Sequence, residues 1–527
     1  MFEFTGKLKT ITFVLMLIGA VSIGASFMGG GDDHHGDADH TEHQDANHDA
    51  ATTHDNESGT GATHSNESNP VATHNYESNH ESHNAGATHS NESNPVATHN
   101  NESSHESHAT EHGDDKLIHK QSGRVEHEHC EDDFHKSSSR ATRDNNHFYT
   151  SPEHHDAEHA HHQEMNKPWA NLMVNNFFFL ALALGALFFL AIQYAAQAGW
   201  SIVVTRIMEA MAQYIAIPVL IMLVLIVLGV NHSHHLWHWM AEGIMDPASA
   251  NFDALLKGKE GYLNGPFFIA RTVIYLVGWA GFAFLIRKMS IKLEVDPNAG
   301  ARWKKMRNYS AGFLVFFAIT SSMSAWDWIM SIDPHWFSTL FGWYIFAGIF
   351  VSALTAMTLI LIYLKSKGYM PEVNDSHLQD LAKFMFAFSI FWTYLWFSQF
   401  MLIWYSNIPE EVTYFVTRFQ DYKLPFLGMV VMNFVFPILM LMNADYKRIP
   451  WFVVMAGLVI LFGHYIDIFN MIMPATVGDR WFIGIPEISS VLLFAGLFIF
   501  VVFTALTKAP LLVKRYPFRK ESEEFHY

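Results

Sequence analysis

The sequence predicts an all-α, polytopic membrane protein with about ten transmembrane helices, and three observations lead to this fold class. Half of the 527 residues are hydrophobic. Ten segments stay mostly apolar over roughly 20 residues, the length at which an α-helix spans the hydrocarbon core of a bilayer. Lys and Arg residues between these segments gather in alternate loops, as expected for a protein that crosses a membrane repeatedly.

In chain order, the expected spans are 10–28, 170–193, 211–230, 267–284, 310–330, 340–363, 384–405, 424–442, 451–472 and 488–507. The first one is ambiguous. Lys7 and Lys9 precede an apolar run that ends in small residues, which also fits a secretory signal peptide. Because the run is long enough to span and no clear A-x-A cleavage site follows, we favour a retained anchor over residues 1–30, with cleavage near Gly24 as the alternative.

Residues 31–168 differ from the rest of the chain. They hold 28 acidic and seven basic residues, whereas the remainder carries 26 basic and 23 acidic ones, and they contain 25 of the 33 histidines. A related 25-residue unit starts at Gly61 and again at Gly86. Because the segment has few large apolar residues to offset chain entropy, we predict a disordered, low-complexity insert and not a solenoid. Residues 169–510 then form the helical membrane domain, and 511–527 form a tail.

The basic residues also predict an orientation. If all ten spans are real, the short loops and ends on one side carry 20 Lys and Arg residues and those on the other side carry five. The positive-inside rule therefore places both termini in the cytoplasm and the His-rich insert outside.

Charged side chains within spans are the first functional candidates, because burying them in lipid is costly. His464 and Asp467 lie three residues apart on the ninth span and share a helix face. An imidazole beside a carboxylate can relay a proton near neutral pH. A structural pair that joins helices is an equal alternative.

Further polar residues extend a candidate proton path. Asp327 lies near the outer end of the fifth span, followed by Asp333 and His335 in a turn; a capped, hydrated hairpin is the alternative. Arg271, in the fourth span, pairs with a carboxylate of a neighbouring helix or snorkels to the interface. On the inner side, Asp380, Lys383 and Asp445 are candidates for a proton entrance, with ordinary interfacial charges as the alternative, and Tyr394 adds a hydroxyl along the seventh span.

Four histidines, His232, His234, His235 and His238, follow the third span. His234 and His238 are four residues apart, a spacing that suits a metal ion on a helix. Four histidines in seven residues are only weak candidates for metal ligands, and adventitious binding is the favoured alternative.

The motifs missing from the sequence exclude several classes of protein. Cys130 is the only cysteine, so the chain has no internal disulfide, no C-x-x-C-H haem attachment and no cysteine-held iron–sulfur cluster. It has no Walker-type phosphate loop. We therefore expect no cofactor bound by this chain, and either solute or proton movement or membership of a larger assembly.

Three stretches resemble a known family. They are SSMSAWDWIMSIDPHWFSTLFGWYIFAGIFVSALTAM (321–357), KFMFAFSIFWTYLWFSQFMLIWYSNIPEE (383–411) and GHYIDIF (463–469). They are similar to the second of the two NrfD-like (polysulfide-reductase-membrane-subunit-like) proteins of bacterial alternative complex III. The resemblance covers residues 169–510. The His-rich insert departs from the family pattern.

The resemblance implies ten helices that include two four-helix bundles, in the bacterial inner membrane. It implies a quinol:cytochrome c oxidoreductase complex with a second NrfD-like subunit, an iron–sulfur subunit, c-type cytochromes and, in some cases, a terminal oxidase. Quinol is the substrate, and haem c and iron–sulfur clusters belong to the partners. Since quinol oxidation is usually assigned to the other NrfD-like subunit, a proton-path or structural role is implied here, at His464, Asp467, Asp327 and Arg271.

The competing hypothesis is a secondary transporter of metal ions such as Zn²⁺ or copper, because a His-rich loop beside a polytopic core is common in such proteins. It expects several His, Asp or Glu side chains to face one another within the spans. Membrane lipid is a partner under either hypothesis, and no nucleic acid is expected.

Overall fold

The computed structural model describes residues 2–29, 152–249 and 251–526, and side chains from Gln163 onward in the second range. This part of the chain is all-α, and ten of its helical segments are long and apolar enough to cross a membrane. Each coincides with one of the ten expected spans. The protein is therefore a multi-pass integral membrane protein, as predicted. The remainder of the insert, Cys130 included, lies outside the described residues.

The bounds of the spanning helices are α1 (Gly6–Gly29), α3 (Pro152–Ala195), α5 (Ala216–Val230), α7 (Gly265–Leu293), α8 (Ala299–Trp328), α9 (Phe341–Ser366), α10 (Asp375–Ser406), α12 (Lys423–Val430) with α13 (Phe436–Leu441), α14 (Pro450–Val477) and α15 (Ile485–Thr507). Several of them, α7, α8, α10 and α14 included, extend beyond the apolar runs that predicted them. Shorter helices are α4 (Thr205–Ala212), α6 (Ala254–Lys259), α11 (Pro409–Gln420) and α16 (Arg519–Glu523).

One boundary differs from the prediction. The insert was expected to reach residue 168, whereas α3 begins at Pro152. Tertiary contacts hold the described side chains of this extension. The Asn166 amide donates to the carbonyls of His235 and Thr476, and its oxygen accepts from the His235 N–H. Polar residues continue a helix readily when such contacts anchor it, so the apolar run alone underestimated its length.

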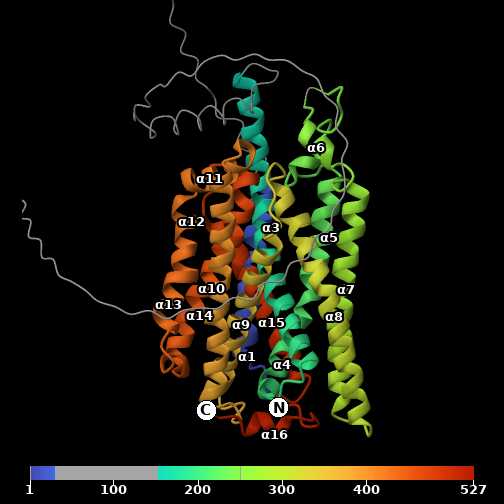
Figure 1. The fold of residues 1–527 in the computed structure, drawn as a ribbon, viewed down its shortest axis with the longest axis vertical. Coiled ribbons are helices and arrows are strands. Elements are labelled where there is room, and N and C mark those ends of the chain that lie inside the picture. The colour runs from blue at the N-terminus through green and yellow to red at the C-terminus, as the bar shows by residue number, and fades with distance from the viewer. Residues whose placement is uncertain (1, 30–151, 250, 527) are drawn as a thin grey trace, which may run out of the picture. The chain divides into compact units, whose positions relative to one another are not determined.

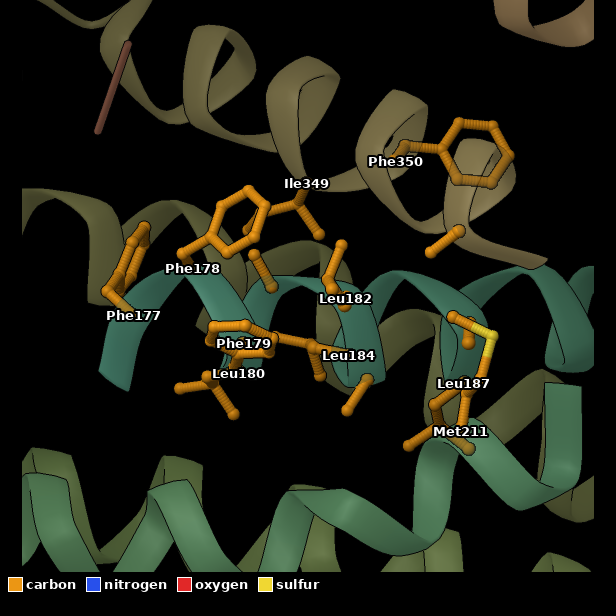
Figure 2. Packing of buried hydrophobic residues seen from close by; sticks show 14 of the residues in the cluster. Phe177, Phe178, Phe179, Leu180, Leu182, Leu184, Leu187, Met211, Ile349 and Phe350 are labelled. Atoms are coloured by element: carbon orange, nitrogen blue, oxygen red, sulfur yellow. The ribbon is translucent and has the colours of Figure 1, made fainter. Parts of the chain in front are cut away.

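The spans form two four-helix groups, in agreement with the two bundles expected. Helices α3, α5, α7 and α8 pack together, and α9, α10, α12–α13 and α14 form the second group (Figure 1). Helix α3 also packs on α9 and α14 and so joins the two groups. In its most apolar stretch, 89% of the residues are buried. Figure 2 shows Phe178, Leu182 and Leu187 of α3 within the apolar packing that includes Ile349 and Phe350 of α9.

Helix α1 packs along α15, and glycines allow the close approach. A Cβ atom at Gly19 would lie 2.4 Å from Cβ of Leu493, and one at Gly496 would lie 3.0 Å from the Thr12 carbonyl oxygen. The opposite side of α1 is exposed and apolar. Exposed members are Ile11, Phe13, Val14, Leu17, Ile18 and Val21, a surface suited to lipid.

Residues 2–5 and the tail 511–526 lie at the same end of the helical unit, which we call the terminal end. Phe2 packs against Phe503 at the end of α15, with ring centroids 5.5 Å apart. The carbonyl of Phe525 accepts from the Asn374 amide, which caps the start of α10. The tail is therefore part of the packed unit.

Candidate functional site

Asp467 is the centre of a buried polar cluster in the second group of helices. It is 2% exposed on α14. The Trp392 indole of α10 donates to Asp467 Oδ2 over 2.8 Å, and the Tyr344 hydroxyl of α9 donates to Oδ1. Two donors from neighbouring helices therefore hold a carboxylate in an apolar interior, where an unpaired charge would be strongly disfavoured.

His464 is the second titratable group of the cluster. Its Nδ1 lies 3.6 Å from Asp467 Oδ2, which is too long for a hydrogen bond but close enough for strong attraction once the imidazole is protonated. The ring is 1% exposed, and neither nitrogen has a hydrogen-bond partner among the described residues. The Trp392 ring stands edge-on to it at 5.3 Å. His464 thus combines burial with unused hydrogen-bonding capacity.

An irregular helix lies beside His464. Residues Val431–Val435 form a π-helical turn between α12 and α13. Pro437 follows it and has no N–H to offer the carbonyl four residues earlier, which favours such an irregularity. The buried Asn433 of this turn packs on Gly463, where a Cβ atom would lie 2.2 Å from its Oδ1. Its amide also has no hydrogen-bond partner among the described residues.

Arg418, on α11, adds a cation on the other side of Asp467. The side chain is 1% exposed, and its three acceptors are the backbone carbonyls of Asn470, Tyr414 and Met471. Pro474 explains the first of these bonds. A proline inside a helix leaves the carbonyl four residues earlier without its donor, and Arg418 Nε supplies one over 3.0 Å.

A small cavity lies between Asp467 and Arg418. It measures about 20 Å³ and is lined by polar and aromatic side chains that include Tyr344, Tyr414, Arg418, Asp467 and Asn470. That volume accommodates about one water molecule. Burial raises the pKa of Tyr414 to about 12, so its hydroxyl stays protonated and can donate. The cavity therefore brings one water-sized space against Asp467 and Arg418.

Arg271 and Asp327 form a separate buried pair in the first group. Arg271 Nη2 donates to Asp327 Oδ1 over 2.8 Å and Nε donates to Oδ2 over 2.9 Å. The Tyr275 hydroxyl also donates to Oδ2 over 2.8 Å. Arg271 therefore pairs with the neighbouring helix and does not snorkel. Because Arg271 and Tyr275 both donate to Asp327, this geometry is typical of a contact that joins two helices, here α7 and α8.

Asp333 and His335 lie in the loop after α8. His335 Nε2 lies 2.7 Å from Asp253 Oδ2. Burial raises the pKa of Asp333, and the positive charges of Arg418, His335 and Lys259 oppose this effect only in part. Asp333 therefore interacts electrostatically with Arg418. This side of the site is the one farther from the terminal end.

The remaining proton-path candidates do not join this cluster. Lys383 Nζ lies 3.0 Å from Asp380 Oδ1, a local pair near the start of α10. Asp445 is exposed in the turn before α14. Tyr394 is 63% exposed on the outer face of α10. Tyr394 and Trp392 are two residues apart, so the helix turns them to different faces.

The four histidines after α5 do not converge. Residues 231–237 form turns and bends, so the helix on which the His234–His238 spacing depends is absent there. His234 is buried, and its Nε2 lies 2.9 Å from the Leu225 carbonyl oxygen; burial lowers its pKa. Across the described residues, no group of three or more His, Cys, Asp or Glu side chains could hold a metal ion.

A third charge cluster lies toward the terminal end, and sequence reasoning gave it little weight. Arg206 Nη1 donates to Glu209 Oε2 over 2.7 Å, and its Nη2 donates to Glu294 Oε1 over 3.0 Å. The Tyr194 hydroxyl donates to Glu209 Oε1 over 3.0 Å. Arg287 Nη1 lies 3.8 Å from Glu209 Oε2. Arg206 and Arg287 had been counted as loop charges. Their burial follows from packing against α3 and the tail, which no local pattern signals.

Tyr344, Trp392 and Arg418 are the other residues that sequence reasoning missed. The useful signal for Arg418 was Pro474, since a proline inside a span predicts an unpaired carbonyl nearby. Comparison with known proteins adds no assignment: no protein-family model and no curated protein matches the sequence.

Proposed function

We propose that this chain is a membrane subunit of a respiratory quinol-oxidising complex of the alternative complex III type, in which its central polar cluster carries protons. Electrons would pass through iron–sulfur and c-haem subunits to a terminal oxidase. In this proposal the chain binds no redox centre, resides in the bacterial inner membrane and has both termini in the cytoplasm.

The observation that carries the proposal is the arrangement around Asp467. A carboxylate held by Tyr344 and Trp392 lies beside an imidazole with two unused nitrogens. Protonating His464 would place a cation 3.6 Å from Asp467, and the hydroxyl of Tyr344 can exchange a proton with the carboxylate. These groups suit stepwise proton transfer through an apolar interior.

The resemblance of residues 321–357, 383–411 and 463–469 supports the choice of complex. Tyr344, Trp392, His464 and Asp467 all lie within these stretches. The lone cysteine also fits a subunit whose electron carriers reside in partners.

The first experiment identifies the assembly. The chain, tagged at its C-terminus, is purified in a gentle detergent, and its visible spectrum and quinol oxidation are measured. We expect c-type haem to co-purify and to be reduced by quinol. A colourless, solitary protein, obtained under conditions that preserve known respiratory complexes, would overturn the assignment.

The second experiment tests the proton role in the purified assembly reconstituted into liposomes. Tyr344→Phe removes the hydroxyl bonded to Asp467, whereas Tyr394→Phe makes the same change on the exposed face of α10. We expect Tyr344→Phe and Asp467→Asn to reduce proton translocation by about ten-fold or more, and Tyr394→Phe to leave it unchanged. Equal translocation by all variants in intact assemblies would leave the cluster with a structural role only.

A metal-ion transporter is the second candidate, and the 25 histidines within residues 31–168 favour it. These residues lie almost entirely outside the described part of the chain. Uptake of Zn²⁺ or copper by proteoliposomes containing the chain alone, abolished by His464→Ala, would support this function over the first.

A further inference from the structure

A second cavity lies at the terminal end of the second helix group. It measures about 170 Å³ and opens between the end of α9 and the starts of α10 and α14. Five apolar residues line it: Leu361, Ile362, Val373, Leu378 and Pro450. An apolar cavity of roughly 150 Å³ holds a six-carbon ring, so this one has room for a short length of hydrocarbon chain.

The cavity lies at the ends of spanning helices, where the headgroup layer of a membrane is expected. Leu361 and Ser366 belong to the last turns of the sixth span, and Pro450 begins the ninth. Leu361 is buried, whereas Ser366 and Pro450 are exposed, so the cavity opens to the surface. Tyr446 and Trp451 are exposed beside Pro450, as is typical of aromatic residues at a membrane interface.

Lys365 and Ser366 supply the polar rim of the cavity. The Lys365 ammonium lies 3.6 Å from Asp375 Oδ1, with side chains 38% and 69% exposed. An exposed ion pair of this kind contributes little free energy, so Lys365 is available to an incoming anion. The cavity therefore combines an apolar interior, a cation and a hydroxyl at its mouth, and a position at headgroup depth.

We propose that this cavity binds an anionic phospholipid, with part of an acyl chain between Leu361 and Leu378 and the phosphate at Lys365. A long-chain amphiphile with a negative headgroup satisfies both the apolar lining and the rim. The proposal is independent of the quinol-oxidising assignment, because it rests only on the described cavity and on the membrane location.

The test uses the purified full-length chain, delipidated and exchanged into nanodiscs that contain phosphatidylcholine with a minor fraction of labelled phosphatidylglycerol or labelled phosphatidylcholine. Lipid retained by the protein is counted by native mass spectrometry. We expect a preference for phosphatidylglycerol that Lys365→Gln lowers about five-fold, the effect of one lysine near an anionic surface. Asp375→Asn should raise the preference, because it removes the competing carboxylate.

Two further variants separate the cavity from general membrane charge. Lys367→Glu changes a neighbouring cation that does not line the cavity, and should preserve the preference. Ile362→Trp fills the cavity and should abolish retention of either lipid, with folding checked by thermal unfolding. Equal retention of both lipids by the wild type, or a preference that survives Lys365→Gln, would overturn the proposal. So would retention unaffected by Ile362→Trp.

Discussion

Asp467 and His464 are buried to nearly the same degree, yet their surroundings differ. Asp467 accepts hydrogen bonds from two side chains, whereas His464 has no hydrogen-bond partner among the described residues. A buried polar group without a partner costs about 1–3 kcal/mol. A buried group in this condition calls for a specific explanation, and this contrast distinguishes His464 from the fully matched Arg271–Asp327 pair.

A pH dependence is expected at the loop between α5 and α7. Burial raises the pKa of Asp253, but hydrogen bonds from His335 and from the Leu255 and Leu256 N–H groups outweigh it, so the pKa lies below its ordinary value of 3.8. A carboxylate with a lowered folded-state pKa adds stability above pH 3.8, and this stability is lost as pH falls through the folded-state value.

Asp253→Asn tests this expectation, because asparagine keeps the helix cap on α6 while removing the charge. The wild type should unfold at a higher temperature than the variant near neutral pH, and the difference should shrink as the pH falls below 3.8. Thermal unfolding in detergent across this range is the measurement. A difference that is constant with pH would show that the charge does not contribute.

At the scale of the helix, Pro474 and Arg418 act as one unit. Arg418→Met would leave the Asn470 carbonyl, which Pro474 deprives of a backbone donor, without the Arg418 Nε donor, and we expect this to lower the free energy of unfolding by about 1–3 kcal/mol. Pro474→Ala restores an N–H for the Asn470 carbonyl. The double variant should therefore be more stable than the sum of the single effects predicts.

Unfolding of the four proteins of this cycle in detergent measures the coupling. The hydrogen bond from Arg418 Nε to the Asn470 carbonyl predicts a coupling free energy of about 1 kcal/mol between the two substitutions, the contribution of one hydrogen bond. Additive effects would show that Arg418 does not depend on the proline.

Helix α1 offers a test with a matched control. Gly19→Leu places a side chain where a Cβ atom already lies 2.4 Å from Leu493 and from the Ser489 carbonyl oxygen, whereas a Cβ at Gly24 meets nothing within 4 Å. We expect Gly19→Leu to separate α1 from α15 and to lower the thermal midpoint by several degrees, since overpacking costs about 1–3 kcal/mol. Gly24→Leu should leave the midpoint unchanged, and equal effects of the two substitutions would contradict this packing.

At the scale of the molecule, ten spans return the chain to the side on which it began. Residues 2–5 and 511–526 accordingly lie at the same end of the helical unit (Figure 1). The Lys and Arg distribution predicts that this end faces the cytoplasm, and the same prediction puts Cys130 on the opposite side.

The single cysteine makes this orientation testable. A membrane-impermeant maleimide should label Cys130 in cells whose outer barrier has been removed. In a Cys130→Ser background, Glu524→Cys should be labelled only after the membrane is permeabilised. The reverse pattern would invert the assigned orientation.

Hydropathy predicted all ten spans, because the free energy of placing a helix in lipid is a sum over its own residues. The same local reasoning selected His464, Asp467, Arg271 and Asp327, since charge within an apolar run stands out. It underestimated α3, which begins at Pro152 and whose polar residue Asn166 bonds distant parts of the chain.

Only the tertiary structure showed which polar groups meet. Asp467 lies 123 residues from Tyr344 and 75 from Trp392, and the rotation of each helix about its axis decides whether such side chains face one another or the lipid. Tyr394 and Trp392 lie in the same apolar run, yet one is exposed and the other bonds Asp467. Helix rotation is set by side-chain packing across the whole bundle, and composition along a single helix does not contain that information.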